Sequence, residues 1–279
     1  MQKLMTAQSS ISSLNSETSN PPLLSPPLKW AGGKRWLVPH LKQIWLHHQH
    51  RRYVEPFCGG LAMSLGLGPE CALLNDRNLH LVNFYRHVQR GLNVTIEMRN
   101  KKADYYACRN RFNELISQGD FQTAEAAQLF YYLNRTCFNG LCRFNQSGAF
   151  NVPFGRYETI NYLRDFDYYR DRFRQWVFRS GDLEQLKLQA GDFIYADPPY
   201  DVEFTSYSPG GFSWEDQVRT ATRLASHNGP VVLSNQATSR IIALYESFGF
   251  QVNYLDGPRR ISSNGDRTAA KEVLACKHI

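Results

Sequence analysis

The chain has 279 residues, 42% of them apolar, which is enough to bury the core of one large domain or of a domain with an insertion. Lys and Arg number 32 against 25 Asp and Glu, and the net charge of +7 modestly favours a polyanionic partner. The six cysteines form no CxxC pair and no apolar stretch could span a bilayer, so we expect a soluble, cytoplasmic protein with reduced thiols and no metal site.

Residues 1–27 are rich in Ser, Asn, Thr and Pro and lack the basic start and apolar core of a signal or transit peptide. We expect a disordered tail there, with the folded sequence beginning at Leu28. The stretches RRYVEPF and CALLND then have the pattern of short buried strands, and helix-compatible LAMSLGL lies between them. Residues 28–77 therefore predict a βαβ unit.

Residues 78–165 differ in character, being charged, aromatic and mostly compatible with helices. The apolar spacing in AEAAQLFYYLNR predicts an amphipathic helix. Just beyond, Tyr168 to Trp176 mixes arginines with aromatic rings, which suits either a helix with solvated arginines or a surface that stacks on bases. We interpret residues 78–165 as a largely helical insertion.

Strand patterns return in residues 166–279. The segments are DFIYAD, GPVVLSNQ, FQVNYLDG and KEVLACK. A turn-rich loop separates the last two, so we expect them to form an antiparallel pair at the edge of the sheet. The chain is thus predicted to fold as an α/β domain that an insertion interrupts.

A glycine pair and an acid suggest a site for a nucleotide-like cofactor. Gly59 and Gly60 follow the first predicted strand, and Asp76 ends the next, where its carboxylate could accept hydrogen bonds from ribose hydroxyls. The pattern is looser than GxGxxG, so an ordinary glycine turn remains an alternative. The stretch AGGKRW imitates part of a P-loop, but it lacks the upstream spacing and the hydroxyl residue after Lys34, which argues against ATP.

The motif DPPY ends the apolar run FIYA. Pro198 and Pro199 cannot extend a strand and make a stiff turn, and ligands of open α/β sheets bind at this end of the strands. The Asp197 carboxylate and the Pro198 carbonyl could each accept one N–H of an exocyclic amine while the Tyr200 ring lies on the base. The alternative is a strand-end turn with a solvated acid and a core tyrosine.

Six motifs in one order carry a resemblance to a known family. They are LKWAGGKRWLVPHL, EPFCGGLA, NDRN, YYLNRTCFNGLCRFNQSGAFNVPFGRY, DFIYADPPYD and RRISSNGDRTAAKEVLA. From Leu28 to about Lys277 the chain resembles the Dam-type DNA adenine-N6 methyltransferases. The resemblance implies a class I methyltransferase that uses S-adenosylmethionine. Its fold would be a Rossmann-like, mostly parallel sheet with an antiparallel edge strand and an inserted helical target-recognition domain.

The same resemblance implies roles for individual residues. The residues expected to bind the cofactor are Trp30, Lys34, Phe57, Gly59, Asp76 and Asp197, and those expected to act on the target base are Asp197, Pro198, Pro199 and Tyr200. The residues expected to contact duplex DNA are Lys29, Phe138, Asn139, Leu141, Arg143, Pro153 and Tyr157. Among these, Arg143 corresponds to a guanine reader, Leu141 and Pro153 to thymine contacts, and Phe138 to a wedge. The implied target is GATC, with no membrane and no obligate protein partner.

Two departures from the family pattern are visible. Leu61 replaces the final glycine of the cofactor motif, and this change bears on the affinity for the cofactor. Phe138 replaces a tyrosine but keeps the flat aromatic ring. A pocket that binds an exocyclic amine would also suit an N4-cytosine or an RNA N6-adenine methyltransferase, although the Asp of DPPY favours adenine in DNA. A non-catalytic DNA-binding repressor of the same fold is a further alternative, and retained cofactor binding would argue against it.

Overall fold

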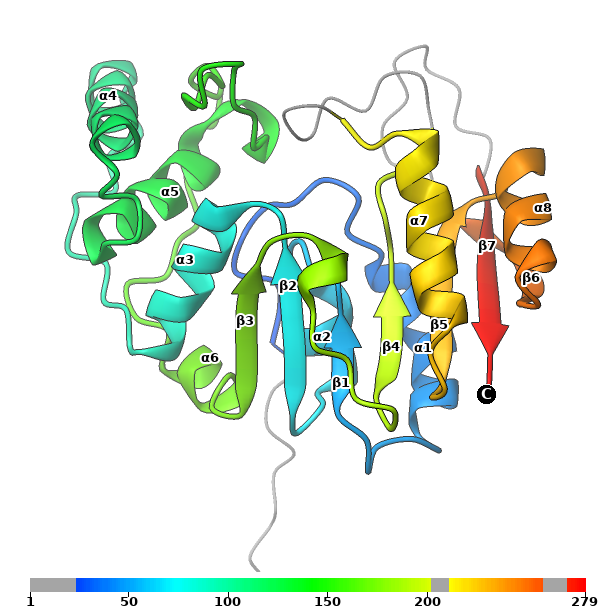
Figure 1. Cartoon of the computed structure of the whole chain (residues 1–279). Helices are drawn as coiled ribbons and strands as arrows, with labels where there is room; N and C mark the ends of the chain where they lie inside the picture. The colour runs from blue at the N-terminus through cyan, green and yellow to red at the C-terminus, as the bar shows by residue number, and fades with distance from the viewer. Residues whose placement is uncertain (1–23, 202–210, 258–269) are drawn as a thin grey trace, which may run out of the picture.

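The computed structural model describes residues 24–201, 211–257 and 270–279, which contain a mixed seven-stranded sheet in the order β3-β2-β1-β4-β5-β7-β6 (Figure 1). The strands are β1 (Tyr53–Glu55), β2 (Ala72–Asp76), β3 (Trp176–Ser180), β4 (Phe193–Ala196), β5 (Val231–Gln236), β6 (Gln251–Gly257) and β7 (Ala270–Lys277). Strands β1 to β5 pair in parallel, whereas β7 runs antiparallel to β5 and to β6. The predicted mostly parallel sheet and the antiparallel pair at its edge are confirmed.

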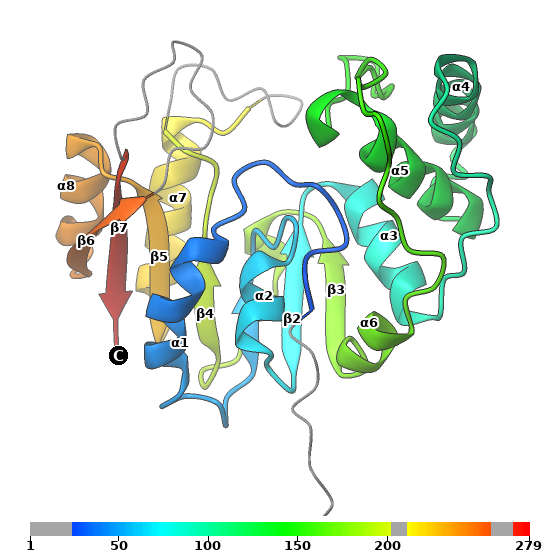
Figure 2. The same ribbon diagram turned by 180° about the vertical axis from the view of Figure 1, so that it is seen from behind.

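Helices cover both faces of this sheet. They are α1 (Val38–Trp45), α2 (Ala62–Leu67), α3 (Leu79–Gln89), α4 (Lys102–Gln118), α5 (Ala124–Thr136), α6 (Asp167–Arg172), α7 (Trp214–Ala225) and α8 (Ser239–Ser247), with short 3-10 turns at η1 (Arg35–Leu37), η2 (Phe138–Gly140) and η3 (Leu183–Gln185). One face packs against α1, α2 and α3, and the other against α7 and α8 (Figures 1 and 2). The layers are those of a doubly wound α/β domain.

The strands alternate their side chains between two cores. Tyr53 and Phe193 join the cluster on the side of α1 and α2, while their neighbours Val54 and Ile194 join the cluster on the side of α7 and α8. Because both faces are covered, these strands carry unbroken apolar runs, which is why the sequence revealed them. No helix in the described ranges is both long and apolar enough to cross a bilayer.

The segment from α4 to residue 165 projects from one end of the sheet (Figures 1 and 2). Helix α5 packs against α3 and α4, and the Thr123 side chain caps its first turn by accepting from the Ala126 N–H at 3.2 Å. Two isolated antiparallel bridges, Cys137 with Phe154 and Phe144 with Phe150, hold the irregular segment that follows α5. Within the predicted insertion the α-helices therefore end at Thr136, and the residues after η2 are irregular.

One strand escaped prediction. No strand was predicted between CALLND and DFIYAD, yet β3 occupies Trp176–Ser180 at the edge of the sheet, directly after the short helix α6. Its residues alternate between buried and exposed, and Val177 is 45% exposed, so the apolar run that marks the inner strands is missing. The correction is that the arginine-rich stretch from Tyr168 to Trp176 holds a helix end and the start of a strand.

The described chain begins at Leu24, which packs against the core, and the Tyr169 hydroxyl donates to the Ser25 carbonyl at 2.7 Å. These contacts lie within the predicted tail, whose residues 1–23 are outside the described residues. The RRISSNG motif, residues 259–265, also lies outside them.

Candidate functional site

A cavity of about 380 Å³ opens at the carboxyl ends of β1, β2 and β4. Every residue predicted for cofactor binding or catalysis lines it: Trp30, Lys34, Phe57, Gly59, Asp76, Asp197, Pro198, Pro199 and Tyr200. This volume lies in the range of small-molecule sites, and the place in the fold is where α/β sheets bind ligands. The chain thus brings together residues that are far apart in sequence.

The carboxylate of Asp76, the last residue of β2, lines the cavity. Its two oxygens accept from the Gly59 N–H at 3.0 Å and from the Asn78 N–H at 2.8 Å. Burial raises the pKa of Asp76, and the two backbone donors partly oppose that rise. Each oxygen can accept a further bond, so the carboxylate suits a vicinal pair of hydroxyls.

The glycine pair has a structural task that the sequence did not reveal. A Cβ on Gly59 or Gly60 would meet atoms of the Trp30 side chain at 2.7 Å. The two glycines therefore let the indole of Trp30 lie against the backbone and form part of the cavity wall. The next residue, Leu61, has φ +64° and is fully buried, and it is not among the lining residues.

An ion cluster surrounds a second lining residue, Lys34, which is only 4% exposed. Its ammonium contacts Asp197 Oδ1 at 2.8 Å and Glu272 Oε2 at 2.9 Å, so one cation bridges β4 and β7. The Ser234 hydroxyl also donates to Asp197 Oδ1, at 3.0 Å. The carboxylate that follows β4 is thereby fixed by partners from elsewhere in the fold.

The tyrosine of DPPY belongs to the same cluster. The Tyr200 hydroxyl donates to Glu272 Oε1, and the Lys34 ammonium lies 4.8 Å from the centre of the Tyr200 ring. Burial, with the nearby carboxylates, raises the pKa of Tyr200, so it remains a donor. Behind the turn, the Gln217 amide donates to the Pro199 carbonyl at 2.7 Å. Contacts from α7 and β7 thus hold both sides of the DPPY turn.

A second acid, Glu55, is buried at the end of β1 and lines the cavity. It accepts hydrogen bonds from Ser64 and, at 3.2 Å, from Tyr53. Burial raises the pKa of Glu55 to about 8, with a smaller contribution from the charge of Asp197. At neutral pH this side chain is therefore mainly protonated and adds little charge to the cavity.

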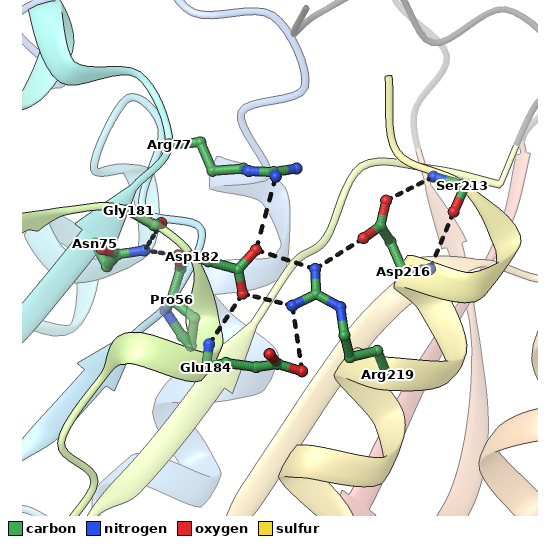
Figure 3. Close-up of polar contacts among 9 residues, drawn as sticks. All are labelled: Pro56, Asn75, Arg77, Gly181, Asp182, Glu184, Ser213, Asp216 and Arg219. Atoms are coloured by element: carbon green, nitrogen blue, oxygen red, sulfur yellow. Dashed lines mark hydrogen bonds and ion pairs between the residues drawn. The ribbon is translucent and has the colours of Figure 1, made fainter. Parts of the chain in front are cut away.

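A network of ion pairs surrounds Asp182 and includes the cavity-lining Arg77 (Figure 3). Arg219 of α7 donates to both oxygens of Asp182, at 2.6 and 3.0 Å, and to Asp216 at 2.8 Å. Arg77, which lines the cavity, approaches Asp182 at 3.7 Å. The hydrogen bonds from Arg219 lower the pKa of Asp182 to about 2. The network ties the connection that follows β3 to the first turns of α7.

The residues predicted to contact DNA gather around η2 and the irregular segment after it. Phe138, Asn139, Arg143 and Pro153 are exposed, with Phe138 at 44%, whereas Leu141 lines the cavity. The other two pack together: the Lys29 ammonium lies 3.5 Å from the centre of the Tyr157 ring.

Two contacts fix the exposed members of this group. Arg143 Nε donates to the Asn151 side-chain oxygen at 2.8 Å, and the Phe138 N–H donates to the Pro153 carbonyl at 2.9 Å. Asn139 adopts φ +52°, and Gly140 follows at φ +64°, where a Cβ would collide with Lys29. The backbone therefore makes a tight, well-supported corner that presents Phe138 and Asn139 outward.

Several residues of the site were missed from the sequence. They are Glu55, Asp182, Gln217, Ser234 and Glu272. Glu55 stood inside the quoted EPFCGGLA motif, and an acid at the end of a buried strand is a usable signal. Glu272 is an acid within the apolar strand KEVLAC, which is also a signal, but its partner Lys34 is 238 positions away.

Comparison with known proteins shows the family of this chain. Residues 30–257 match the family described as D12 class N6 adenine-specific DNA methyltransferase. A retron Ec67 DNA adenine methylase of Escherichia coli is 35% identical, with 89% of this chain and 90% of that protein aligned. A DNA adenine methylase of Vibrio cholerae is 33% identical over 89% and 94% of the two chains.

A DNA N-6-adenine-methyltransferase of Escherichia phage P1 is 36% identical over 88% of this chain but only 34% of its own length, so the present chain spans about a third of that relative. The family match covers most of the chain, and the bacterial relatives align over nearly their whole length. The chain therefore belongs to the D12 class of N6-adenine-specific DNA methyltransferases, and S-adenosylmethionine is its cofactor.

Proposed function

We propose that the protein methylates N6 of adenine in double-stranded DNA at GATC, after turning the adenine out of the duplex into the cavity beside Tyr200. The observation that carries the proposal is the shared cavity: the DPPY turn lines it after β4, and Asp76 lines it at the end of β2, on the other side of β1. A base bearing an exocyclic amine and an adenosyl cofactor could thus meet between the two carboxylates.

The residues present fit S-adenosylmethionine. Asp76 keeps lone pairs for ribose hydroxyls, Trp30 offers an aromatic wall, and the carboxylates around Lys34 suit a positively charged group. When bound, this cofactor supplies a methyl group activated by a sulfonium.

Asp197 is the group we assign to the target amine. Its Oδ1 accepts from Lys34 and Ser234, which leaves Oδ2 to accept one N6–H, while the Pro198 carbonyl accepts the other. The N6 lone pair, otherwise delocalised into the ring, is then directed at the methyl carbon. Transfer would form the N–C bond as the C–S bond breaks, with S-adenosylhomocysteine as the leaving group, and the surplus proton of N6 would pass to solvent. No covalent enzyme intermediate is needed.

Recognition of the sequence is assigned to the exposed group after α5. The Arg143 guanidinium, oriented by Asn151, could give two hydrogen bonds to guanine O6 and N7 in the major groove. Phe138 is the wedge that would fill the space left by the extruded adenine, at a cost of a few kcal/mol for unstacking. Lys29, which packs on the Tyr157 ring, and Leu141, which lines the cavity, are assigned to the outer guanine and to thymine.

Product analysis tests the proposal. The purified protein is incubated with S-adenosylmethionine and a GATC duplex, a matched duplex with one base pair of the site changed, the single strand, or the corresponding RNA, and the nucleosides are identified by mass spectrometry. We expect N6-methyladenosine of the deoxy series from the GATC duplex above all. N4-methylcytosine or a preference for RNA would favour the corresponding alternatives, and no methylation despite cofactor binding would indicate an inactive DNA-binding protein.

Expression in a host that lacks adenine methylation extends the test to a whole genome. Modified adenines confined to GATC are expected, and modification at another sequence would refute the assignment of Arg143 and its neighbours while leaving the chemistry intact.

A further inference from the structure

Glu272 is buried on β7, only 7% exposed, and it stands behind Lys34 and Tyr200, which line the cavity. One oxygen accepts from the Lys34 ammonium at 2.9 Å and the other accepts from the Tyr200 hydroxyl. Both of its donors thus belong to the cavity wall, although Glu272 itself does not. A buried carboxylate is costly unless its surroundings compensate it, so its presence calls for a reason.

The positive and negative charges around Lys34 are not equal in number. In the described parts of the chain, Lys34 is the cation paired with Asp197 and with Glu272, so two carboxylates share one ammonium. Of the other titratable groups here, Glu55 is mainly neutral because burial raises its pKa to about 8, and Tyr195 and Tyr200 keep their protons because burial raises their pKa values. Counted over the described residues, the cluster therefore carries one uncompensated negative charge.

We propose that Glu272 is a positioning and charge-setting residue, whose negative charge makes the cavity prefer a cationic sulfonium cofactor over its neutral thioether product. This inference rests on the proposed function. During methyl transfer a unit positive charge moves from sulfur to N6 and then departs with a proton. A site with one excess negative charge holds the cationic reactants and releases the neutral product more readily. Asp197 alone, paired with Lys34, would leave the cluster neutral.

An electrostatic role of Glu272 predicts a different effect on the two ligands than a purely structural role does. Removing the charge of Glu272 should weaken binding of S-adenosylmethionine more than that of S-adenosylhomocysteine, which differs by one methyl group and one positive charge. A unit charge acting across several ångströms at an effective dielectric constant near 20 changes this affinity ratio on the order of tenfold. A lost structural contact would weaken both ligands alike.

Calorimetric titration of both compounds into wild type, Glu272→Gln, Glu272→Asp and Tyr200→Phe measures this ratio. We expect Glu272→Gln to lower the preference for the sulfonium on the order of tenfold. Glu272→Asp, which keeps the charge, should stay within about threefold of wild type. Tyr200→Phe removes the hydroxyl donor to Glu272 but no charge, so its ratio should be unchanged. Sinefungin, which carries an amine in place of the sulfonium, should follow S-adenosylmethionine.

An unchanged ratio in Glu272→Gln, with a cooperative thermal transition retained, would overturn the proposal. Should that variant fail to fold, Glu272→Asp decides, because a large loss of sulfonium preference with the charge retained would contradict it. Wild-type protein that binds neither compound would refute the proposed function itself. If wild type binds both compounds and methylates DNA, but Glu272→Gln has the same preference between them, only the role of Glu272 is refuted.

Discussion

Leu61 allows a sharp test of the backbone at the cofactor motif. It is fully buried, and its φ of +64° lies in the left-handed region that side chains other than glycine adopt at a cost of about 1–2 kcal/mol. Leu61→Ala and Leu61→Gly both remove the buried side chain, which destabilises by roughly 2–5 kcal/mol. Only glycine also escapes the strain. Glycine also makes the unfolded chain more flexible, which lowers the stability of the folded protein by roughly 0.5–1 kcal/mol. The strain relieved exceeds this cost, so Leu61→Gly should be more stable than Leu61→Ala by about 0.5–1 kcal/mol.

The matched control is Leu65, a buried leucine inside α2, where the backbone is helical. There glycine should be less stable than alanine by about 1 kcal/mol. Urea unfolding at equal m-value measures all four variants. Because Leu61 does not line the cavity, the affinity of folded Leu61→Gly for S-adenosylmethionine should change by less than about threefold. An alanine variant at least as stable as the glycine variant at position 61 would refute the reasoning.

Three further predictions concern recognition, extrusion of the base and pH. Arg143→Ala should relax discrimination at its guanine by roughly 1–3 kcal/mol, measured as the ratio of kcat/KM for GATC and for a duplex altered at that guanine; equal ratios would contradict the assignment. Phe138→Ala should leave the melting temperature nearly unchanged, because the ring is 44% exposed, yet slow methyl transfer. A mismatch opposite the target adenine should partly restore that rate, since a weakly paired base is easier to extrude. A Phe138→Ala variant as fast as wild type on matched DNA would contradict the role of Phe138 as a wedge. Glu55 has a pKa raised to about 8 in the folded state, against 4.5 ordinarily, so the folded protein holds a proton that the unfolded chain has lost between these values. Stability is therefore lost as pH rises through this window, and denaturant titrations at pH 5 and 8 should show wild type losing roughly 4 kcal/mol more than Glu55→Gln. Parallel curves would show that Glu55 is ionised.

The inner strands could be predicted from the sequence because both faces of the sheet are covered. The run Phe193 to Ala196 is wholly buried, and so is most of β5, so their apolar character is unbroken. Strand β3 failed this test, because it lies at the edge and exposes every second residue in its first half. Its neighbours, arginines and aromatics, also have the spacing of a helix. Pairing with β2 makes it a strand, and the local sequence does not indicate that pairing.

The site was predictable where local motifs carry it and obscure where the fold assembles it. Asp76 and Asp197 each end a recognisable strand, and both line the cavity. The role of Glu272 could not be predicted, because it depends on contacts with Lys34 and Tyr200, which are distant in sequence and meet Glu272 only in the fold. The use of Gly60 was also hidden, because Trp30 fills the space that a side chain there would need.

The central claim is that the Asp197 carboxylate, held by Lys34 and Ser234, orients the amine of the target adenine. Single-turnover methyl transfer to a GATC duplex by Asp197→Ala, at cofactor and DNA concentrations shown by titration to saturate the variant, tests it most directly. We expect a rate at least about a hundredfold below wild type. A rate close to that of wild type under saturation would contradict the account.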